Sequence, residues 1–524
     1  MKLTSPWALR LGALLAGLAA GLAHPPFGLL PGLLGYALLL GLLDQPSARP
    51  LRQGFFRGWL AGVGYFAVSV WWVVEPFMVD AANQGWMAPF ALVLMAGGLA
   101  LFWGLAGLLY TAVRPQSAAL RVLVLAGALC GLEWVRGHVM TGFPWNLPGE
   151  TWAAGSAPSQ LASLLGAYGL SWVTVAVAAA PAVLLATESK RSKALTIGAA
   201  GLALAALYGF GFWRMQGAPA APVGPVVRVV QANIDQKEKW RPENLDAIFE
   251  TYVALTQQPA ARRPDIVVWP EGALPAVIDD IVAPGSPYAP RLTGAVAPGQ
   301  TLLMGANRAE LTAEGQARYF NSLIAFRRDP DGGALRVTAV YDKFRLVPFG
   351  EFMPLGEFAT RIGFRSLVHM PEDFSPGPPP RPLTAVGMPP LQPLICYEAL
   401  FPALTRRGAD VEGPRAAWIL NASNDAWFGM TSGPLQHLNI ASYRAIEDGL
   451  PIVRATPTGV SAVIDAYGRI MPGKRLGLGE LGVIDAPLPA ALPLTPYARF
   501  GDLGFGLLLL VSAGVALIAR VRRA

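Results

Sequence analysis

Eight apolar windows interrupt this chain, and they restrict its possible folds more than any other feature of the sequence. Spanning a bilayer takes roughly 20 mostly apolar residues. Windows of about that length lie near residues 7–23, 27–43, 54–74, 88–113, 119–135, 161–187, 194–213 and 501–519. The composition agrees, because 53% of the 524 residues are hydrophobic, 14% are charged and the mean hydropathy is +0.41. Such a chain is too apolar to be one ordinary soluble domain.

The stretch of mixed polarity between the last two windows predicts a separate domain outside the membrane. We expect a membrane domain of about seven transmembrane helices at 1–213, a globular domain at 220–495, and a C-terminal transmembrane helix with a basic tail at 501–524. The first window also has features of a cleaved signal peptide, with Lys2 before it and small residues near Ala23. Cleavage there would not change which side of the membrane each later connection lies on.

Lysine and arginine gather in every second connection between the windows. Cytoplasmic loops of membrane proteins carry such a positive excess. We therefore expect both termini in the cytoplasm and the globular domain on the opposite face. The pI near 9.5 then follows mostly from topology, and it does not predict nucleic-acid binding. The basic residues concerned are Lys2, Arg49, Arg52, Arg57, Arg114, Arg121, Lys190, Arg191, Lys193, Arg520, Arg522 and Arg523.

Short β-rich runs alternate with amphipathic helical stretches in the globular domain. This alternation predicts an α/β layered fold in which helices cover the sheets. Helical periodicity is clearest at 244–256 and 435–447. The predicted strands are 226–230, 266–269, 302–305, 322–326, 337–341, 393–395, 417–421, 452–455 and 460–464, each bounded by Gly, Pro, Asn or Asp.

Three of these strands end at residues with reactive side chains, namely Glu271, Lys343 and Cys396. A carboxylate, an ammonium and a thiol can together form an acyl-transfer site. Cys396 is the only cysteine outside the apolar windows, because Cys130 lies inside the fifth. An unpaired thiol in an exported domain is unusual. An inert, buried core cysteine is the alternative that this residue alone leaves open.

A thiol attacks carbonyls as its thiolate, and a free cysteine with a pKa of about 8.5 is mostly protonated at neutral pH. We expect Glu271 to accept that proton, and Lys343 to favour the thiolate and then the oxyanion, together with the backbone N–H of Tyr397. Neither His437 nor His369 has neighbours in the sequence that indicate a Cys–His pair. The chain shows no metal-ligand spacing and no glycine-rich phosphate loop, so we expect no metal and no cofactor.

Two further acidic residues are candidates for supporting roles. Glu351 is a candidate to orient Lys343 or to take part in proton transfer. Glu398 is a candidate to stabilise the turn that carries Cys396. A buried structural carboxylate that balances Lys or Arg is the alternative for both.

Aromatic residues near the predicted site are candidates to contact substrate. Trp240 and Trp427 would line an acyl pocket, and Tyr397 would wall the acyl chain or the amine, although an aromatic residue at a strand end is more often core. The apolar segment after Glu351 is a candidate lid that dips into the lipid interface, with a surface helix packed on its own domain as the alternative. The lid candidates are Phe352, Phe358 and Phe364.

Charged residues are few inside the apolar windows. Glu133 and Arg136 would pair across one helix turn or reach towards the interface from the end of the fifth window. Buried acidic or basic residues in mid-helix, which would mark an ion path, are not expected. A transporter or lipid-binding scaffold is therefore the least favoured function.

Several ordered motifs resemble those of the nitrilase, or carbon-nitrogen hydrolase, superfamily, and along the whole chain those of the bacterial apolipoprotein N-acyltransferase family. Positions that match the superfamily's Glu-Lys-Cys triad are Glu271, Lys343 and Cys396. The other matching motifs are Gln231, Asn233, Ile234, Gln236, Lys239 and Trp240, the Trp269-Pro270-Glu271 turn, the runs 341–351, 396–398 and 421–429, and the membrane-loop runs 133–137 and 142–145.

The resemblance implies an αββα sandwich on the extracytoplasmic face of the bacterial inner membrane. It implies transfer of an acyl chain from a membrane glycerophospholipid, through a Cys396 thioester, to the α-amine of a diacylglyceryl apolipoprotein. Asn424, in the run 421–429, is carried over as a supporting or substrate-binding residue. The chain departs from the family pattern at Ser442 and Pro457, where relatives commonly show Arg and Asn, which puts details of the substrate loop in doubt. A membrane-tethered hydrolase that passes the acyl chain to water is the main rival.

Overall fold

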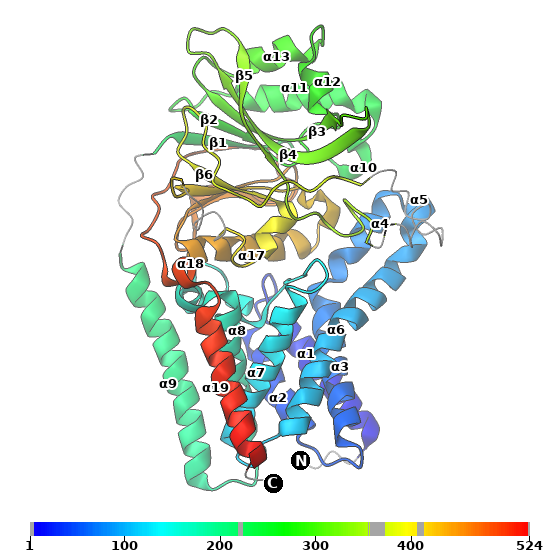
Figure 1. The fold of residues 1–524 in the computed structure, drawn as a ribbon, viewed down its shortest axis with the longest axis vertical. Coiled ribbons are helices and arrows are strands. Elements are labelled where there is room, and N and C mark those ends of the chain that lie inside the picture. The colour runs from blue at the N-terminus through cyan, green and yellow to red at the C-terminus, as the bar shows by residue number, and fades with distance from the viewer. Residues whose placement is uncertain (1–4, 218–223, 355, 357–372, 406–412, 522–524) are drawn as a thin grey trace.

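The computed structural model describes residues 5–217, 224–354, 356, 373–405 and 413–521. A helical part and an α/β part lie one above the other along the longest axis of the molecule (Figure 1). Both ends of the described chain lie at the end of the helical part that points away from the α/β part (Figure 1).

The helical part contains long apolar helices that correspond to the eight windows. Four segments are long and apolar enough to cross a membrane by length and composition, namely Ala81–Val113, Ala118–Arg136, Pro158–Leu185 and Lys190–Met215. A fifth is Pro50–Ser69 if it continues through Trp71–Val79 across a 65° bend, and three shorter apolar helices are Pro6–Leu22, Leu30–Leu43 and Leu503–Ala519. The principal helices are α1 (Pro6–Leu22), α2 (Leu34–Leu43), α3 (Pro50–Ser69), α4 (Glu75–Val79), α5 (Ala81–Gln84), α6 (Ala88–Val113), α7 (Ala118–Arg136), α8 (Ala162–Ala179), α9 (Lys190–Met215) and α19 (Leu503–Val521).

Glycines allow α1, α3 and α6 to pack with their backbones in close contact. A Cβ added to Gly17 of α1 would lie 1.7 Å from the carbonyl oxygen of Ala61 in α3. A Cβ on Gly58 of α3 would lie 2.3 Å from the carbonyl oxygen of Trp103 in α6. Small residues at such crossings are the usual means of helix association in a lipid environment, where apolar side chains gain little by leaving the lipid.

Buried charges in the helical part confirm one expectation from sequence and correct another. Glu133 and Arg136 form an ion pair as expected, but both are buried and do not reach towards an interface. Trp103 donates a hydrogen bond of 2.8 Å to Glu133. Arg57 lies within α3 and is buried, whereas the windows were expected to lack buried charges in mid-helix; it donates to the carbonyl oxygens of Leu42 (2.7 Å) and Gln45 (3.1 Å). Each of these charged side chains is thus bound to a nearby partner. This local pairing does not indicate an ion path through the helical part.

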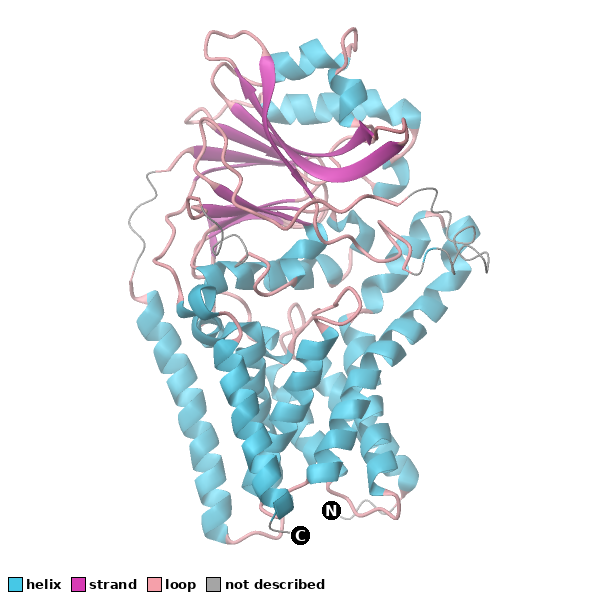
Figure 2. Cartoon of the chain, in the orientation of Figure 1, coloured by secondary structure: helices cyan, strands magenta, loops and turns pink. Residues whose placement is uncertain are grey.

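The α/β part consists of two sheets packed face to face between layers of helices (Figures 1 and 2). The six-stranded sheet has the order β11-β1-β2-β3-β4-β5 and the five-stranded sheet the order β10-β9-β8-β7-β6. All nine runs predicted from sequence form strands. The bounds are β1 (Val226–Gln231), β2 (Ile266–Trp269), β3 (Thr301–Leu311), β4 (Ala317–Arg328), β5 (Leu335–Asp342), β6 (Leu391–Ile395), β7 (Trp418–Ala422), β8 (Ile452–Ala455), β9 (Ser461–Ile464), β10 (Ile470–Leu476) and β11 (Gly482–Pro487).

Helices cover the outer face of each sheet. On the six-stranded sheet these are α11 (Leu245–Thr256), α12 (Ile278–Val282) and α13 (Tyr288–Ala295) (Figure 1). Helix α17 (Gly433–Asp448) covers the five-stranded sheet and lies between it and the helical part (Figure 1). Every residue of α17 except Leu435 is buried. The core between the sheets is formed by inward-facing side chains such as Val229, Val268, Leu303, Leu420 and Val453.

Candidate active site

Three strand ends bring the predicted triad together. Glu271 follows β2, Lys343 follows β5 and Cys396 follows β6. The Lys343 ammonium lies 3.1 Å from Oε1 of Glu271. The charges of both groups act on the pKa of the Cys396 thiol, so the sulfur lies within their electrostatic range. All three side chains are buried, and Cys396 is 9% exposed.

Lys343 is held between two carboxylates. Its Nζ lies 2.9 Å from Oε1 of Glu351 as well as 3.1 Å from Glu271. The Nδ2 of Asn321 donates to Oε1 of both glutamates at 2.7 Å, and the backbone N–H of Val347 donates to the other oxygen of Glu351. Burial by itself would lower the pKa of Lys343, but the two carboxylates outweigh that effect and raise it. Lys343 is therefore a fixed cation at the pH at which the protein works.

Glu398 anchors the turn that carries Cys396. Its Oε2 accepts the backbone N–H of Ile395 at 2.7 Å, and its Oε1 accepts the hydroxyl of Tyr341 at 2.7 Å and the backbone N–H of Phe344 at 2.8 Å. The carboxylate thus joins the ends of β5 and β6. Cys396 itself has a φ of +47°, a left-handed conformation that costs a non-glycine residue free energy and that the surrounding contacts must hold in place.

The surroundings of Cys396 favour its protonated thiol form. Burial raises its pKa to about 12, and the nearby Glu271 carboxylate adds to this rise, while Lys343 opposes it only in part. Lys343 acts in the expected direction, towards the thiolate, but burial and the carboxylate outweigh this single ammonium.

His437 contacts the nucleophile turn, which its neighbours in the sequence did not indicate. Its Nε2 lies 3.3 Å from the carbonyl oxygen of Cys396, and its Nδ1 lies 2.9 Å from Oδ1 of Asp425. Arg454 donates to Oδ2 of Asp425 at 2.6 Å. Burial first, and then Arg454, lower the pKa of His437. The His437 ring therefore supports the turn through the backbone of Cys396. The other histidine considered, His369, lies outside the described residues.

The aromatic candidates occupy two kinds of position. Trp240 is 49% exposed and Trp427 is 38% exposed, so neither is a core residue. Tyr397 is buried and faces the helical part: its hydroxyl donates to the carbonyl oxygen of Gly142, and its ring stacks 6.5 Å from that of Phe143. This contact joins the nucleophile turn to the loop that follows α7.

The remaining candidates are placed as follows. The backbone N–H of Asn424 donates to Oε2 of Glu271 at 2.7 Å, which orients the carboxylate. Ser442 is buried in α17, and its hydroxyl donates to the carbonyl oxygen of Leu438 at 2.7 Å. Phe352 is half-buried beside Pro348, whereas Phe358 and Phe364 lie outside the described residues.

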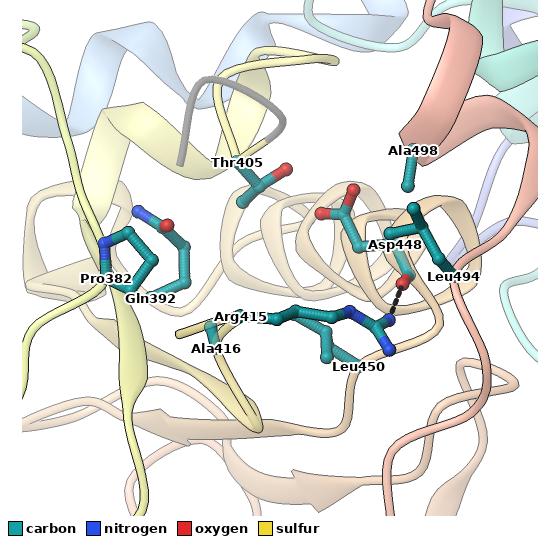
Figure 3. A pocket seen from close by; sticks show the side chains of 9 residues that line it. All are labelled: Pro382, Gln392, Thr405, Arg415, Ala416, Asp448, Leu450, Leu494 and Ala498. Atoms are coloured by element: carbon teal, nitrogen blue, oxygen red, sulfur yellow. Dashed lines mark hydrogen bonds between the residues drawn. The ribbon is translucent and has the colours of Figure 1, made fainter. Parts of the chain in front are cut away.

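A separate pocket lies on the flank of the α/β part near α18 (Pro496–Phe500) (Figure 3). Arg415 crosses it and donates to the carbonyl oxygen of Asp448 at 2.8 Å. None of the triad residues lines it. Across the described ranges, no group of three His, Cys, Asp or Glu side chains is placed to hold a metal ion.

Comparison with known families matches both parts of the chain. Residues 16–180 match the model of the apolipoprotein N-acyltransferase N-terminal domain, and residues 226–493 match that of carbon-nitrogen hydrolase. The apolipoprotein N-acyltransferase of Caulobacter vibrioides is 56% identical over 99% of this chain and 95% of its own. That of Rhodopseudomonas palustris is 39% identical over 95% and 92%. The solved structure of an amidase from Nesterenkonia sp. matches 56% of this chain and 98% of its own chain at 20% identity, with a TM-score of 0.35.

Proposed function

Because this chain belongs to the apolipoprotein N-acyltransferase family and is an acyltransferase, we propose that it transfers an acyl chain from a membrane glycerophospholipid to a lipoprotein. The acceptor is the α-amine of the N-terminal diacylglyceryl-cysteine. The observation that carries this proposal is the buried Glu271–Lys343 pair beside Cys396, on a turn that is tied to the helical part through Tyr397. The enzyme works in two half-reactions through a thioester.

In the first half-reaction the Cys396 sulfur attacks the ester carbonyl as Glu271 takes its proton. The oxyanion that forms is stabilised by the Lys343 ammonium and the backbone N–H of Tyr397. The carbon–oxygen bond of the ester then breaks, and Glu271 returns the proton to the leaving alkoxide, which departs as a lysophospholipid. The acyl chain remains as a thioester on Cys396.

In the second half-reaction the lipoprotein amine attacks that thioester. Glu271 takes the proton from the attacking nitrogen, the same oxyanion contacts are used, and the carbon–sulfur bond breaks. Glu271 then protonates the departing sulfur, which restores the thiol and the carboxylate. A buried site favours this route over hydrolysis, because water has to be kept from the thioester until the amine arrives.

We place the α/β part on the periplasmic face of the bacterial inner membrane, with both termini in the cytoplasm. Support comes from the basic connections of the helical part and from the position of both chain ends, opposite the α/β part (Figure 1). A donor ester near the outer surface of the membrane would then lie on the same side as Cys396.

Intact mass spectrometry after incubation with phospholipid alone tests the covalent step. We expect an acyl adduct on the peptide that contains Cys396, and no adduct in Cys396→Ala. Adding a diacylglyceryl lipopeptide should consume the adduct faster than buffer does. Equal loss in buffer and in lipopeptide would identify a hydrolase instead, and a fully active Cys396→Ala protein would remove the mechanism.

A further inference from the structure

A second buried ammonium lies beside the catalytic carboxylate. The short helix α10 (Gln236–Lys239) begins at Asp235, which accepts the backbone N–H of Lys237. This turn directs Gln236 and Lys239 inwards, where they are 4% and 1% exposed, while Lys237 between them stays exposed. A Cβ on Gly272 would lie 3.5 Å from the Lys239 nitrogen, so that nitrogen lies close to the backbone next to Glu271.

Gln236 joins α10 to the triad. Its Oε1 accepts the side-chain amide of Asn424 at 3.2 Å, and the backbone N–H of Asn424 in turn donates to Oε2 of Glu271. The amide nitrogen of Gln236 is therefore oriented by a residue that already contacts the catalytic carboxylate. Both inward side chains of α10 belong to the surroundings of the site.

The donors at the ends of these two side chains have no hydrogen-bond partner in the part of the chain that the structure describes. The atoms are Nζ of Lys239 and Nε2 of Gln236. A buried ammonium without a partner is strongly destabilising. The Lys239 nitrogen lies 5.6 Å from the centre of the Trp240 ring, a contact that offsets only part of this cost. Lys343, by contrast, has two carboxylate partners.

Burial lowers the pKa of Lys239 to about 8, although the Glu271 carboxylate acts in the opposite direction. The group is therefore mostly charged at neutral pH and loses its charge just above it. A bound anion would stabilise the charged form. Among the described residues, the resting site thus holds two inward donors without an acceptor, one of them cationic.

We propose that Lys239 and Gln236 form a binding site for the phosphate group of the phospholipid acyl donor. This proposal rests on the function proposed above, because that donor carries a phosphodiester a few bonds from the ester that Cys396 attacks. Lysine binds phosphate as a point charge, and an amide N–H adds a directed hydrogen bond. The half-exposed ring of Trp240 lies next to Lys239 and offers an apolar surface to the glycerol carbons.

The test compares a donor that carries the phosphate with one that lacks it. Full-length protein in detergent micelles is incubated with dioleoyl phosphatidylglycerol or with dioleoylglycerol, and the rate of adduct formation on Cys396 is followed by intact mass spectrometry at several donor mole fractions. The wild-type protein should use the phospholipid at least about 10-fold better. In Lys239→Met we expect the phospholipid concentration for half-maximal rate to rise about 10- to 100-fold, with a much smaller effect on the dioleoylglycerol rate.

Three variants sharpen the comparison. Lys239→Arg should retain most of the preference for phospholipid, because the charge is kept, and Gln236→Leu should lose part of it. Lys237→Met is the matched control on the exposed side of α10 and should behave as the wild type. Inorganic phosphate should compete with the phospholipid in the wild type at high concentration and should not affect the dioleoylglycerol reaction.

Equal use of the two donors by the wild type would overturn the phosphate site. So would an equal loss with both donors in Lys239→Met and Gln236→Leu, since this would indicate a role in holding Glu271 or in folding. Competition by inorganic phosphate without a donor-specific effect in either variant would place the phosphate elsewhere. A wild-type protein that forms no adduct with either donor would contradict the proposed function itself.

Discussion

At the scale of single residues, Glu271 has two opposite effects on the ionisation of Cys396. As a negative charge, Glu271 raises the pKa of the thiol, after burial. As the proposed base, it would remove the thiol proton during attack. Replacing it with glutamine removes both effects, and different measurements detect each of them.

For Glu271→Gln we therefore expect faster alkylation and slower acylation. The pH at which iodoacetamide modifies Cys396 should move to lower values, because the thiol loses a negative neighbour. Adduct formation from phospholipid should fall by at least about 100-fold, because general base catalysis contributes 10²–10⁴-fold. Lys343→Gln should instead move the alkylation profile to higher pH, since Lys343 lowers the pKa of the thiol. Slower alkylation in Glu271→Gln would contradict the electrostatic account.

Asn321 provides a second test, because one amide bridges both glutamates that flank Lys343. Asn321→Leu keeps the approximate size and removes the donor. A hydrogen bond to a charged group contributes about 1.5–3 kcal/mol, so we expect acylation to slow by about 10- to 100-fold. Asn244→Leu removes an amide that bonds only to a surface carbonyl and is the control. Unchanged acylation in Asn321→Leu would show that Lys343 and the backbone N–H groups of Asn424 and Val347 position the two carboxylates without the amide.

The sequence indicated the triad because each member directly follows a strand, and strand ends are recognisable in a single chain. The sequence did not indicate the roles of Asn321 and His437. Their partners, Glu271 and Cys396, lie 50 and 41 residues away along the chain. Asn321 lies inside β4 and His437 inside α17, where a polar residue carries no local sign of its partner. Such contacts depend on how sheets and helices pack, which residue types alone do not specify.

At the scale of secondary-structure elements, α17 connects the nucleophile turn to the helical part. On one side His437 contacts the carbonyl oxygen of Cys396. On the other, Gln436 accepts a hydrogen bond of 3.0 Å from Trp145, and Glu447 accepts the backbone N–H of Ala167 at 2.8 Å. Most polar groups on a buried helix need such a partner, because leaving them unpaired is costly.

Tyr443 of α17 offers a measurement of this connection. Its buried hydroxyl lies 3.0 Å from the carbonyl oxygen of Gly149 and 2.6 Å from that of Trp152 in the helical part. We expect Tyr443→Phe to lower stability by about 1–3 kcal/mol, because it leaves buried carbonyl oxygens without their donor. Thermal unfolding in detergent would show a lower Tm. Tyr319→Phe is the control, since Tyr319 is only half-buried on β4, and an equal Tm for the two variants would argue against the connection.

Strands β10 and β11 were missed by the sequence interpretation for a physical reason. β10 lies at an edge of its sheet, contains Pro472 and Gly473, and alternates exposed with half-buried residues. β11 ends in Asp485-Ala486-Pro487, and Asp485 pairs with Arg228 across the strand pair at 2.7 Å. Edge strands tolerate proline, glycine and charge, so they lack the apolar runs by which central strands are recognised.

At the scale of the whole molecule, the loop that follows α7 joins the helical part to the segments around the triad. Tyr397 donates to Gly142, and Arg345 donates to the carbonyl oxygen of Thr141 at 3.0 Å. Both donors belong to segments that adjoin the triad. The position of Cys396 is therefore set partly by the helical part, and an isolated α/β part would lack that support.

Topology is the property of the whole molecule that is most directly tested. Ala48 lies between α2 and α3, Ala313 lies between β3 and β4, and both are exposed. With α/β residues on the periplasmic side, a membrane-impermeant maleimide should label Ala313→Cys in intact spheroplasts. It should label Ala48→Cys only after the inner membrane is permeabilised, because in the proposed orientation the basic connections would face the cytoplasm. The native thiols Cys130 and Cys396 are buried, so the unmodified protein provides the background. Labelling of Ala48→Cys in intact spheroplasts would reverse the orientation and place Cys396 on the cytoplasmic side.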